Sequence, residues 1–336
     1  MGACKVYVET HPACVGLLDP NTTLASSSST LEKNPAHTTS QYRVHHFLET
    51  TLRTHKSRVY DLAKANIVFF NASFSFRHSL RYKCYDALND YASRTNLLVF
   101  AVSFGATTFF PHFAGPHKPN VRWITMQEVG HHTSLPVPFA IFEPRWLVYP
   151  DGLHKKKPPA WDDRKLVFFA GHLPKKKYST VRITVYRLLQ NKPYASIHGT
   201  GLHENITQSR LTYDQFVDES MSHKFCIVAS GDNFATPKFA ESLLFAAKGG
   251  CLPIFVPGQK GKYPFEDRFN LRNLIPYSRA GDIVDTVEKL GNMTSAQAEQ
   301  MRQKIREIAY YFASYETERE QSAPSATIEE MCEWAP

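Results

Sequence analysis

Short apolar segments alternate with longer amphipathic segments along most of the chain. Strands of a parallel sheet are buried on both faces and read as continuous apolar runs, whereas the helices that cover them carry apolar residues every three or four positions. In the first half, this pattern predicts strands at Lys5–Glu9, Ala65–Phe70, Asn96–Val102 and Trp146–Pro150, and helices at Gln41–Arg53 and Leu80–Ala92. Strands that alternate with helices indicate a parallel sheet with helices on its faces.

The same alternation restarts after a charged, proline-rich segment, Asp151–Asp163, which we interpret as an interdomain linker. Beyond it, the pattern predicts strands at Arg164–Gly171, Ala195–His198, Lys224–Ser230 and Cys251–Val256, a further apolar segment at Leu274–Ser278, and helices at Thr180–Gln190, Tyr213–Ser220 and Ile283–Leu290. A chain of 336 residues is long for one hydrophobic core. We therefore expect two doubly wound α/β domains with a cleft between them.

The end of the chain combines a long amphipathic pattern with a polar tail. The pattern over Ser295–Tyr315 predicts a helix with Ser295 as its N-cap, and the tail from Glu316 is expected to be disordered. Thr22–Ser40 is rich in serine and threonine and is expected to be a loop. The predicted division is a first domain at 1–155, a second domain at 156–294, a C-terminal helix at 295–315 and a tail at 316–336.

The clearest local unit is Ser230–Pro257 together with the apolar run before it. KFCIVA supplies a strand, and the polar sequence SGDN turns the chain at the carboxyl end of that strand. Thr236 is placed to cap the helix that follows, and Pro237 fits its first position. Gly249 or Gly250 ends the helix, and CLPIFV returns as a parallel strand.

The loop of this unit has the chemistry to hold a phosphate. Ligands of open α/β sheets bind beyond the carboxyl ends of the strands, where a helix N-terminus offers N–H groups and positive potential. Lys238 adds a cation, and Glu241 offers two acceptors for a ribose diol, so the unit could bind a nucleotide diphosphate. Every βαβ crossover has such a helix N-terminus, however, and the two side chains could instead form an ordinary ion pair on the helix surface.

Several segments resemble the exostosin-like glycosyltransferases, glycosyltransferase family 47. The most specific is MSHKFCIVASGDN…ESLLFAAKGGCLPIFV, which is similar to that family's S-K-F-C-L-x-P-x-G-D stretch followed by G-C-I-P-V. RKLVFFAG followed by Arg182 resembles the family's F-x-G…R segment, and YPFEDRFNLRN resembles its P-F-E-D segment. CKVYVET, VYDLAKANIVFF and ITMQEV…WLVYPDG resemble elements of its N-terminal half, so the resemblance covers nearly the whole chain.

The resemblance implies a GT-B fold, in which two Rossmann-like domains face each other and the second holds most of a nucleotide-sugar donor, expected to be a UDP-sugar. It also implies transfer with inversion to a glycan or polysaccharide acceptor, which could be anionic, and a C-terminal helix that crosses back to the first domain. A homodimer or a heterodimer is compatible with this interpretation. The chain departs from the family where Arg94-Thr95-Asn96 stands in place of G-x-D-H ahead of a first-domain strand.

Inverting transfer requires that the diphosphate leaving group is stabilised, that the acceptor hydroxyl is deprotonated and that both are held in line. The residues that we expect to bind the donor are Gly171, Arg182, Ser230, Gly231, Asp232, Lys238 and Glu241. The catalytic base is expected in the first domain, with Glu128 and His131 as the candidates and His132 and Asp151 as further ones. Arg182 could equally be a surface residue of its helix, and each candidate base could be a bystander.

The sequence does not favour a metal-dependent reaction. It contains no D-x-D, which argues against the metal-dependent donor site of the GT-A fold, and helix dipoles with cations would replace the ion in a GT-B site. A metal site made of His131 and His132 with His112 and His117 is disfavoured because adjacent histidines rarely bind one ion together. We therefore expect a UDP-sugar as the donor substrate and no metal cofactor.

The formal net charge of +8 favours anionic partners such as nucleotides, phosphates or acidic glycans, although a basic solvated surface explains it equally well. Lys155–Lys157 and Lys175–Lys177 are two lysine runs that either are solvated or rim the cleft. No signature of a nucleic-acid-binding module is present, and nucleic acid is not an expected partner. The six cysteines form no zinc-type cluster, and Cys226 and Cys251 are expected to be buried thiols.

Glycosylation sequons of the form N-x-S/T occur at Asn21, Asn71, Asn205 and Asn292, and they matter only if the chain enters a secretory lumen. No secretory apolar segment follows the first residues, and the longest apolar stretch, Asn96–Phe110, is shorter than the ~20 residues of a membrane span. We therefore expect a soluble chain as written. The resemblance suggests the Golgi lumen if a membrane anchor is missing, and the cytoplasm otherwise.

Two other functions stay open at this point. A non-catalytic relative that binds a glycan or a nucleotide sugar would account for the missing G-x-D-H. A nucleotide-dependent enzyme of another type on the same fold, such as a sugar-nucleotide epimerase, is disfavoured because the chain has no G-x-G-x-x-G. A glycosyltransferase reaction is the leading hypothesis.

Overall fold

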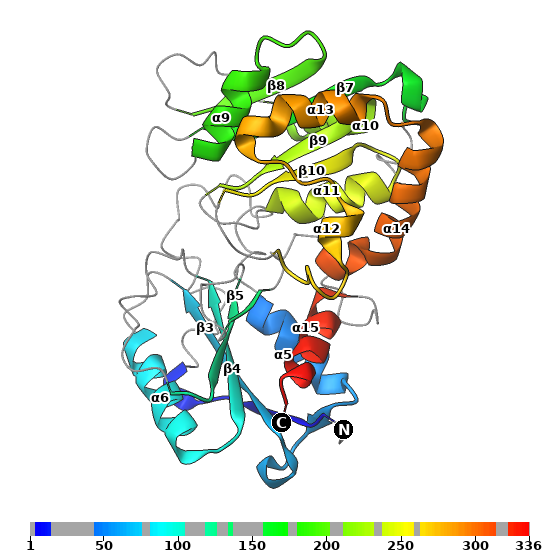
Figure 1. The fold of residues 1–336 in the computed structure, drawn as a ribbon. Helices are drawn as coiled ribbons and strands as arrows, with labels where there is room; N and C mark the ends of the chain where they lie inside the picture. The colour runs from blue at the N-terminus through cyan, green and yellow to red at the C-terminus, as the bar shows by residue number, and fades with distance from the viewer. Residues whose placement is uncertain are drawn as a thin grey trace. The chain divides into compact units, whose positions relative to one another are not determined.

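The computed structural model describes residues 4–14, 44–75, 81–104, 118–125, 134–136, 157–173, 180–201, 211–231, 237–258, 263–313 and 322–335. The chain divides into two compact units, Met1–Arg145 with Ser314–Pro336 (unit 1) and Trp146–Ala313 (unit 2). Each unit is built on its own parallel sheet with helices packed against it (Figure 1). This confirms the predicted fold class of two doubly wound α/β domains. The cleft that a GT-B fold places between them stays a prediction.

Unit 1 contains a six-stranded parallel sheet in the order β2-β1-β3-β4-β5-β6. Its strands are β1 (Val6–Glu9), β2 (Arg58–Val59), β3 (Ile67–Ser75), β4 (Leu98–Phe104), β5 (Val121–Thr125) and β6 (Ser134–Pro136), and its helices are α5 (Val44–Thr54), α6 (Arg81–Arg94) and α15 (Ala323–Glu333). The strands β1, β3 and β4 and the helices α5 and α6 confirm the predicted elements. The pattern did not single out β2, β5 and β6, and the predicted strand Trp146–Pro150 and loop Thr22–Ser40 lie outside the described residues.

The side chains of β3 show why a parallel strand reads as a continuous apolar run. Ile67 and Phe69 pack into the core that α5 and α15 cover, whereas Val68 and Phe70 pack into the core that α6 covers. Successive side chains of a strand point to opposite faces, so a sheet buried on both faces needs an apolar residue at every position. In Figure 1, α6 lies on one side of this sheet and α5 and α15 lie together on the other.

The prediction of a disordered tail is wrong, because residues from Ala323 onward form the helix α15. Ser322 caps it by accepting a hydrogen bond from the Ser325 backbone N–H, at 3.3 Å. Ile328 and Met331 are fully buried in the same core as α5. The polar residues of the tail suggested disorder, but these few apolar side chains at helical spacing are enough to hold the segment against the sheet.

Unit 2 contains a four-stranded parallel sheet in the order β10-β9-β7-β8. Its strands are β7 (Lys165–His172), β8 (Ala195–Thr200), β9 (His223–Ala229) and β10 (Leu252–Val256), and its helices are α9 (Thr180–Leu189), α10 (Tyr213–Ser222), α11 (Pro237–Ala247), α12 (Leu271–Leu274), α13 (Ile283–Gly291) and α14 (Ser295–Ala313). All four strands, and α9, α10, α11, α13 and α14, were predicted. The apolar segment Leu274–Ser278 adds only an isolated bridge, between Tyr277 and Phe255.

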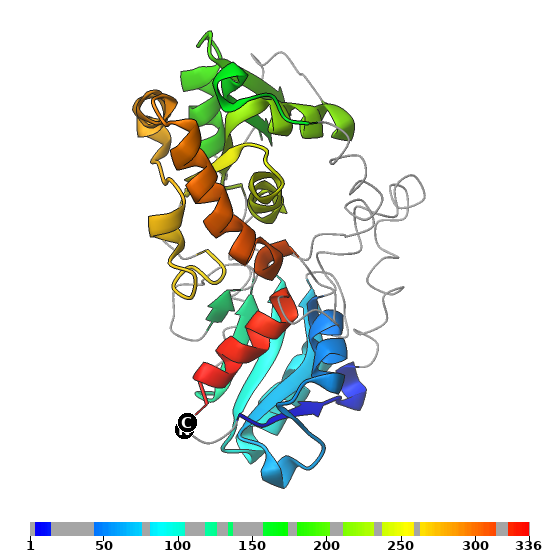
Figure 2. The same cartoon turned by 90° about the vertical axis from the view of Figure 1, so that its right-hand side faces the viewer.

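The long helix α14 belongs to unit 2, where it packs across α11 (Figure 2). The ring of Phe312 lies 5.4 Å from that of Phe239 on α11, edge to face. The helix is counted with unit 2 and the chain from Ser314 onward with unit 1, so the expectation that residues 295–315 cross back to the first domain stays a prediction. The N-cap of α14 also differs from the prediction: Thr294 accepts the Gln297 N–H at 3.3 Å, and Ser295 is the first helical residue.

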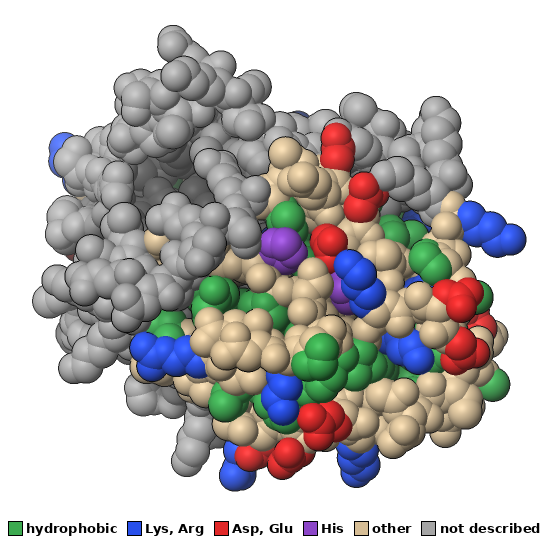
Figure 3. All heavy atoms as spheres, turned by 90° about the horizontal axis from the view of Figure 1, so that it is seen from above, with side chains coloured by type: hydrophobic (Ala, Val, Ile, Leu, Met, Phe, Trp, Pro, Cys, Tyr) green, Lys and Arg blue, Asp and Glu red, His purple; other side chains and the backbone are tan. Residues whose placement is uncertain are grey.

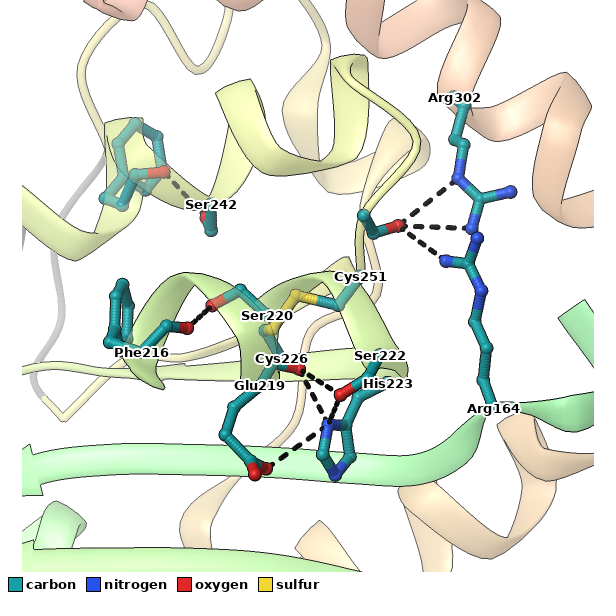
Figure 4. Close-up of a disulfide and its surroundings, with 12 residues drawn as sticks. Arg164, Phe216, Glu219, Ser220, Ser222, His223, Cys226, Ser242, Cys251 and Arg302 are labelled. Carbon is teal, nitrogen blue, oxygen red and sulfur yellow. Dashed lines mark hydrogen bonds and ion pairs between the residues drawn. A yellow bond between two sulfur atoms is a disulfide. The ribbon is translucent and has the colours of Figure 1, made fainter. Parts of the chain in front are cut away.

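All six cysteines are paired, so the expectation of buried thiols at Cys226 and Cys251 is wrong. The three disulfides are Cys4–Cys332, Cys14–Cys84 and Cys226–Cys251. The first joins the segment just before β1 to α15. The third, drawn in Figure 4, joins β9 to the residue before β10. Parallel pairing of β9 with β10 brings Cys226 opposite Pro253, which places Cys251 near enough for a bond, with the two Cα atoms 5.5 Å apart.

Gly250, next to Cys251 of that disulfide, anchors α14 to the sheet. The main-chain carbonyl of Gly250 accepts hydrogen bonds from Arg164 at 3.2 Å and from Arg302 of α14 at 3.1 and 3.3 Å (Figure 4). Burial and the neighbouring Arg302 charge lower the pKa of Arg164 to about 10, so it stays cationic at neutral pH.

Among the described helices, none is both long enough and apolar enough to cross a membrane.

Candidate functional site

The strand order of unit 2 places a topological switch point between β7 and β9. The chain leaves β7 through α9 to reach β8 on one side, and later returns to β9 on the other side. At such a point the two outgoing connections separate, and open α/β sheets bind their ligands beyond the carboxyl ends of these strands. The N-termini of α9 and α11 follow β7 and β9 respectively, so both helix dipoles present their positive ends to this edge.

Arg182, in the first turn of α9, lies across this switch point. Its Nε donates to the Ala229 carbonyl at the end of β9, at 3.2 Å, and its Nη1 donates to the His172 carbonyl at the end of β7, at 3.4 Å. The side chain is half-buried. The predicted donor-binding arginine is therefore held as a cation at the carboxyl edge of the sheet, and the simple alternative of a solvated surface arginine does not describe it.

Three glycines lie at the strand ends, and two of them, Gly231 and Gly258, let the first turn of α9 approach closely. A Cβ on Gly231, after β9, would lie 2.5 to 2.7 Å from the Arg182 guanidinium, and a Cβ on Gly171, in β7, would lie 2.9 Å from the Phe169 ring. Gly258, after β10, would place its Cβ 2.6 Å from Val181 and 2.7 Å from the Ser230 hydroxyl oxygen. Gly171 and Gly231 were predicted site residues. Gly258 was missed, although a Pro-Gly pair directly after a strand is a recognisable signal.

Ser230 is buried at the end of β9 and is tied to the neighbouring strand. Its N–H donates to the Val256 carbonyl of β10 at 3.1 Å, and its hydroxyl group lies 3.5 Å from the same oxygen. These bonds hold the carboxyl ends of β9 and β10 together. The main-chain bond of Ser230 therefore fixes the backbone where the chain leaves β9.

Lys238 and Glu241 of α11 contact each other. Their charged groups lie 2.6 Å apart, and the Lys238 ammonium also sits 3.6 Å from the centre of the Phe216 ring on α10. Lys238 is 42% exposed and Glu241 is 15% exposed, so the pair lies at the surface with the carboxylate turned inward. The structure brings the two predicted residues together as an ion pair, and their roles toward a diphosphate and a ribose stay predictions.

Several predicted residues lie outside the described part of the chain. These are the catalytic candidates Glu128 and His131, the further candidates His132 and Asp151, the donor-binding residue Asp232, the cap residue Thr236, and the histidines His112 and His117. The run Lys175–Lys177 also lies outside it, as do Lys155 and Lys156. Within the described residues, no group of three or more His, Cys, Asp or Glu side chains is arranged to hold a metal ion.

The segment that resembles P-F-E-D has a structural role in unit 2. Glu266 is 5% exposed, forms an ion pair with Arg272 and accepts the Tyr263 backbone N–H at 2.9 Å. Tyr277 lies beside it, and burial followed by the Glu266 charge raises the pKa of Tyr277 far above its usual value. Phe265, which has a positive φ of 54°, packs its ring against Phe312 of α14. This cluster holds the segment after β10 against α14.

A cavity of about 410 Å³ lies among α12, α13 and α14. Its lining includes Lys289, Asn292, Met293 and Lys304, and none of its lining residues belongs to the carboxyl edge described above.

On the face of unit 2 that Figure 3 presents, acidic and basic side chains are interspersed, so the positive net charge is not gathered into one patch there.

No protein-family model matches the chain, and no curated protein sequence matches it significantly. Similar solved structures include a glycotransferase of kitacinnamycin, with 8% identity, a TM-score of 0.37 and 100% of both chains covered. The glycosyltransferase SnogD from Streptomyces nogalater has 12% identity, a TM-score of 0.33 and 100% of both chains covered. An alpha-glucosyltransferase in complex with UDP-glucose and DNA containing an abasic site has 7% identity and a TM-score of 0.36, covering 93% of this chain and 96% of that one.

Structural similarities with TM-scores of 0.33 to 0.37 do not by themselves establish a shared fold. The class of protein therefore rests on the strand orders and helices described above, which define a chain of two parallel α/β units. The membership in glycosyltransferase family 47 that the motifs suggest stays a prediction.

Proposed function

We propose that this protein is a glycosyltransferase of the GT-B type, which transfers a sugar from a nucleotide donor, expected to be a UDP-sugar, to a glycan acceptor. The observation that supports it best is Arg182, whose guanidinium spans the carboxyl ends of β7 and β9 at the switch point of unit 2. Two of the motifs that resemble exostosin-like enzymes end at the same edge, since RKLVFFAG forms most of β7 and KFCIVA forms most of β9, which Ser230 and Gly231 follow. Fold geometry and sequence resemblance thus point independently to one edge of one sheet.

The proposed role of this edge is to bind the diphosphate. A cation and two helix N-termini supply positive potential where the leaving group develops negative charge, and they do so without a metal ion. Gly231 carries no side chain at the edge, and the Arg182 guanidinium fills the space that a Cβ would take, so the glycine lets this cation lie directly against the end of β9. In this role the Glu241 carboxylate would release its ion pair with Lys238 and accept hydrogen bonds from the ribose hydroxyl groups.

The proposed reaction is a single displacement. The acceptor hydroxyl oxygen forms a bond to the anomeric carbon of the sugar, while the bond from that carbon to the diphosphate oxygen breaks and the nucleoside diphosphate leaves. A base takes the hydroxyl proton, and Glu128 and His131 are the candidates for it. Attack from the face opposite to the leaving group inverts the configuration at the anomeric carbon.

The direct test is a screen of nucleotide sugars by thermal shift, followed by calorimetry on any that stabilise the protein. A ligand that binds only the folded state raises the free energy of unfolding by about 2.7 kcal/mol at 100 times its Kd. We expect UDP or a UDP-sugar to bind to the wild type, and to bind more weakly to Arg182→Ala. If no nucleotide or nucleotide sugar binds, the proposal fails. If donor binds but no acceptor or water receives its sugar, the chain is a non-catalytic binding protein.

A further inference from the structure

The turn between α13 and α14 has the sequence Asn292-Met293-Thr294, a sequon for N-linked glycosylation. The Asn292 backbone N–H donates to the Leu290 carbonyl and ends α13. Thr294 and Gln297 cap α14 reciprocally: the Thr294 N–H donates to the Gln297 side chain at 2.9 Å, and the Gln297 N–H donates to Thr294 Oγ1 at 3.3 Å. The sequon is therefore a defined turn that joins two helices.

This turn is fixed to the body of unit 2, while its sequon side chains face outward. The Met293 carbonyl accepts a hydrogen bond from the Trp161 indole N–H at 2.8 Å. Asn292 and Thr294 are both exposed. A cavity of about 410 Å³ adjoins Asn292, so a sugar on this side chain would face open space and would displace no packed residue.

A second sequon in the described residues has the opposite environment. Asn71, in Asn71-Ala72-Ser73, is 1% exposed and Ala72 is fully buried, at the point where the pairing of β3 with β4 shifts register. Because the Asn71 side chain is buried between Phe70 and Ala72, which are both fully buried, a glycan on Asn71 would have to pass through packed protein. The folded structure therefore accepts a glycan at Asn292 and excludes one at Asn71. The sequons at Asn21 and Asn205 lie outside the described residues.

The cysteine pairing indicates that the chain folds where N-glycosylation takes place. All six cysteines form disulfides, and two of the three bonds join residues far apart in sequence, with separations of 328 and 70 residues. Disulfides form and persist in oxidising compartments such as the secretory lumen, whereas cytosolic reductants keep thiols free. Oligosaccharides are attached to asparagine in the same lumen.

We propose that this protein folds in an oxidising secretory lumen and carries an N-linked glycan on Asn292, with Asn71 left unmodified. The donor is an oligosaccharide linked to a lipid diphosphate. The Asn292 side-chain nitrogen forms a bond to the first sugar's anomeric carbon, the bond from that carbon to the diphosphate breaks, the nitrogen loses one proton and the lipid diphosphate leaves. The proposal does not depend on the glycosyltransferase function, because it concerns what is attached to the chain and not what the chain binds.

The test is mass spectrometry of the full-length protein purified from the cells that produce it. Enzymatic removal of N-glycans in heavy-oxygen water converts a glycan-bearing asparagine into labelled aspartate. We expect the label in the Asn292 peptide and an unlabelled asparagine at position 71. An unlabelled Asn292 in most molecules, or a label at Asn71, overturns the proposal.

Matched variants, expressed through a eukaryotic secretory pathway, separate glycan loss from misfolding. Asn292→Gln and Thr294→Ala should each run at a lower apparent mass than the wild type, by the mass of one glycan. Thr294→Ser retains both the sequon and the helix cap and should run like the wild type. Asn292→Gln should keep the wild-type unfolding midpoint after enzymatic deglycosylation of both proteins. If the mobility of Asn292→Gln equals that of the wild type, no glycan is attached at this position and the proposal is wrong.

Discussion

The Nε atom of Arg182 on α9 donates to the main-chain carbonyl of Ala229 at the end of β9, across 3.2 Å. The two residues are 47 positions apart in the chain, and the contact joins the helix after β7 to the strand beside it. A second bond, to the His172 carbonyl, holds the same guanidinium at the end of β7. A cation is therefore positioned at the switch point of the unit 2 sheet before any ligand arrives.

Replacement of Arg182 by alanine should weaken UDP-donor binding by a factor of roughly 10 to 100, because hydrogen bonds to charged groups contribute about 1.5–3 kcal/mol. Isothermal calorimetry measures the change in Kd. Arg187→Ala is the matched control, since Arg187 is an exposed arginine in the last turn of the same helix. Equal donor affinities for the two variants would contradict the assignment of Arg182.

Gly231→Ala tests the position of the guanidinium without removing it. The new methyl group would lie 2.5 to 2.7 Å from Arg182 side-chain atoms, so the flexible arginine end must move while the backbone does not. We expect a lower donor affinity with a nearly unchanged free energy of unfolding. Gly281→Ala is the control, because a Cβ on Gly281 meets no atom within 4 Å. A donor affinity that matches the control variant would count against this site.

The pair formed by Lys238 and Glu241 should matter for the donor and little for stability. The two residues lie at the surface of α11, and ion pairs of this kind contribute about 0.2–1 kcal/mol to the free energy of unfolding. If Glu241 binds the ribose, Glu241→Ala should lower donor affinity by about tenfold, as expected for the loss of hydrogen bonds to a carboxylate. A double-mutant cycle with Lys238→Ala measures the coupling. Donor binding that is unaffected by Glu241→Ala would leave the residue with only its ion pair.

The disulfide Cys226–Cys251 should stabilise unit 2 substantially. Its sequence separation is 25 residues, and a loop of this size predicts a contribution of about 3–4 kcal/mol to the free energy of unfolding. Denaturant unfolding of the double variant Cys226→Ala with Cys251→Ala measures the loss. A titration of free thiols in the unfolded, non-reduced wild type should find none, and any reactive thiol would contradict complete pairing.

His223 should make the protein less stable in acid. It is fully buried, and this burial lowers its pKa more strongly than the Glu219 carbonyl and carboxylate raise it, with Lys165 and His198 lowering it further. Below a pH of about 6.5 the His223 ring is protonated in the unfolded state but stays neutral in the folded state, where its pKa is lower. The free energy of unfolding therefore falls as the pH decreases, by at most about 1.4 kcal/mol per pH unit.

Unfolding of the wild type and of His223→Gln, measured between about pH 7.5 and 5.5, tests this relation. The variant lacks the titrating ring and should show a shallower dependence on pH. Identical slopes for the two proteins would show that His223 does not contribute to the acid sensitivity.

The tertiary structure changed the interpretation of several local signals. The tail after Glu316 is polar in composition, yet Ile328 and Met331 bury α15 against unit 1. Cys226 and Cys251 lie in apolar runs, as buried thiols would, but the parallel pairing of β9 with β10 brings them within bonding distance. Neither outcome depends on local sequence, because each requires segments that only the fold brings together.

The amino-acid sequence by itself determined the two parallel α/β units, and it predicts a binding edge at the carboxyl end of the second sheet. Burial on both faces requires apolar residues at every position of a strand such as β10, and this constraint is local and readable from the sequence. Only the tertiary structure decided that Arg182 reaches Ala229, that Lys238 lies over the Phe216 ring, and which sequon faces solvent. Those relationships depend on how helices and strands distant in the chain pack together, and periodicity along a sequence carries no information about that.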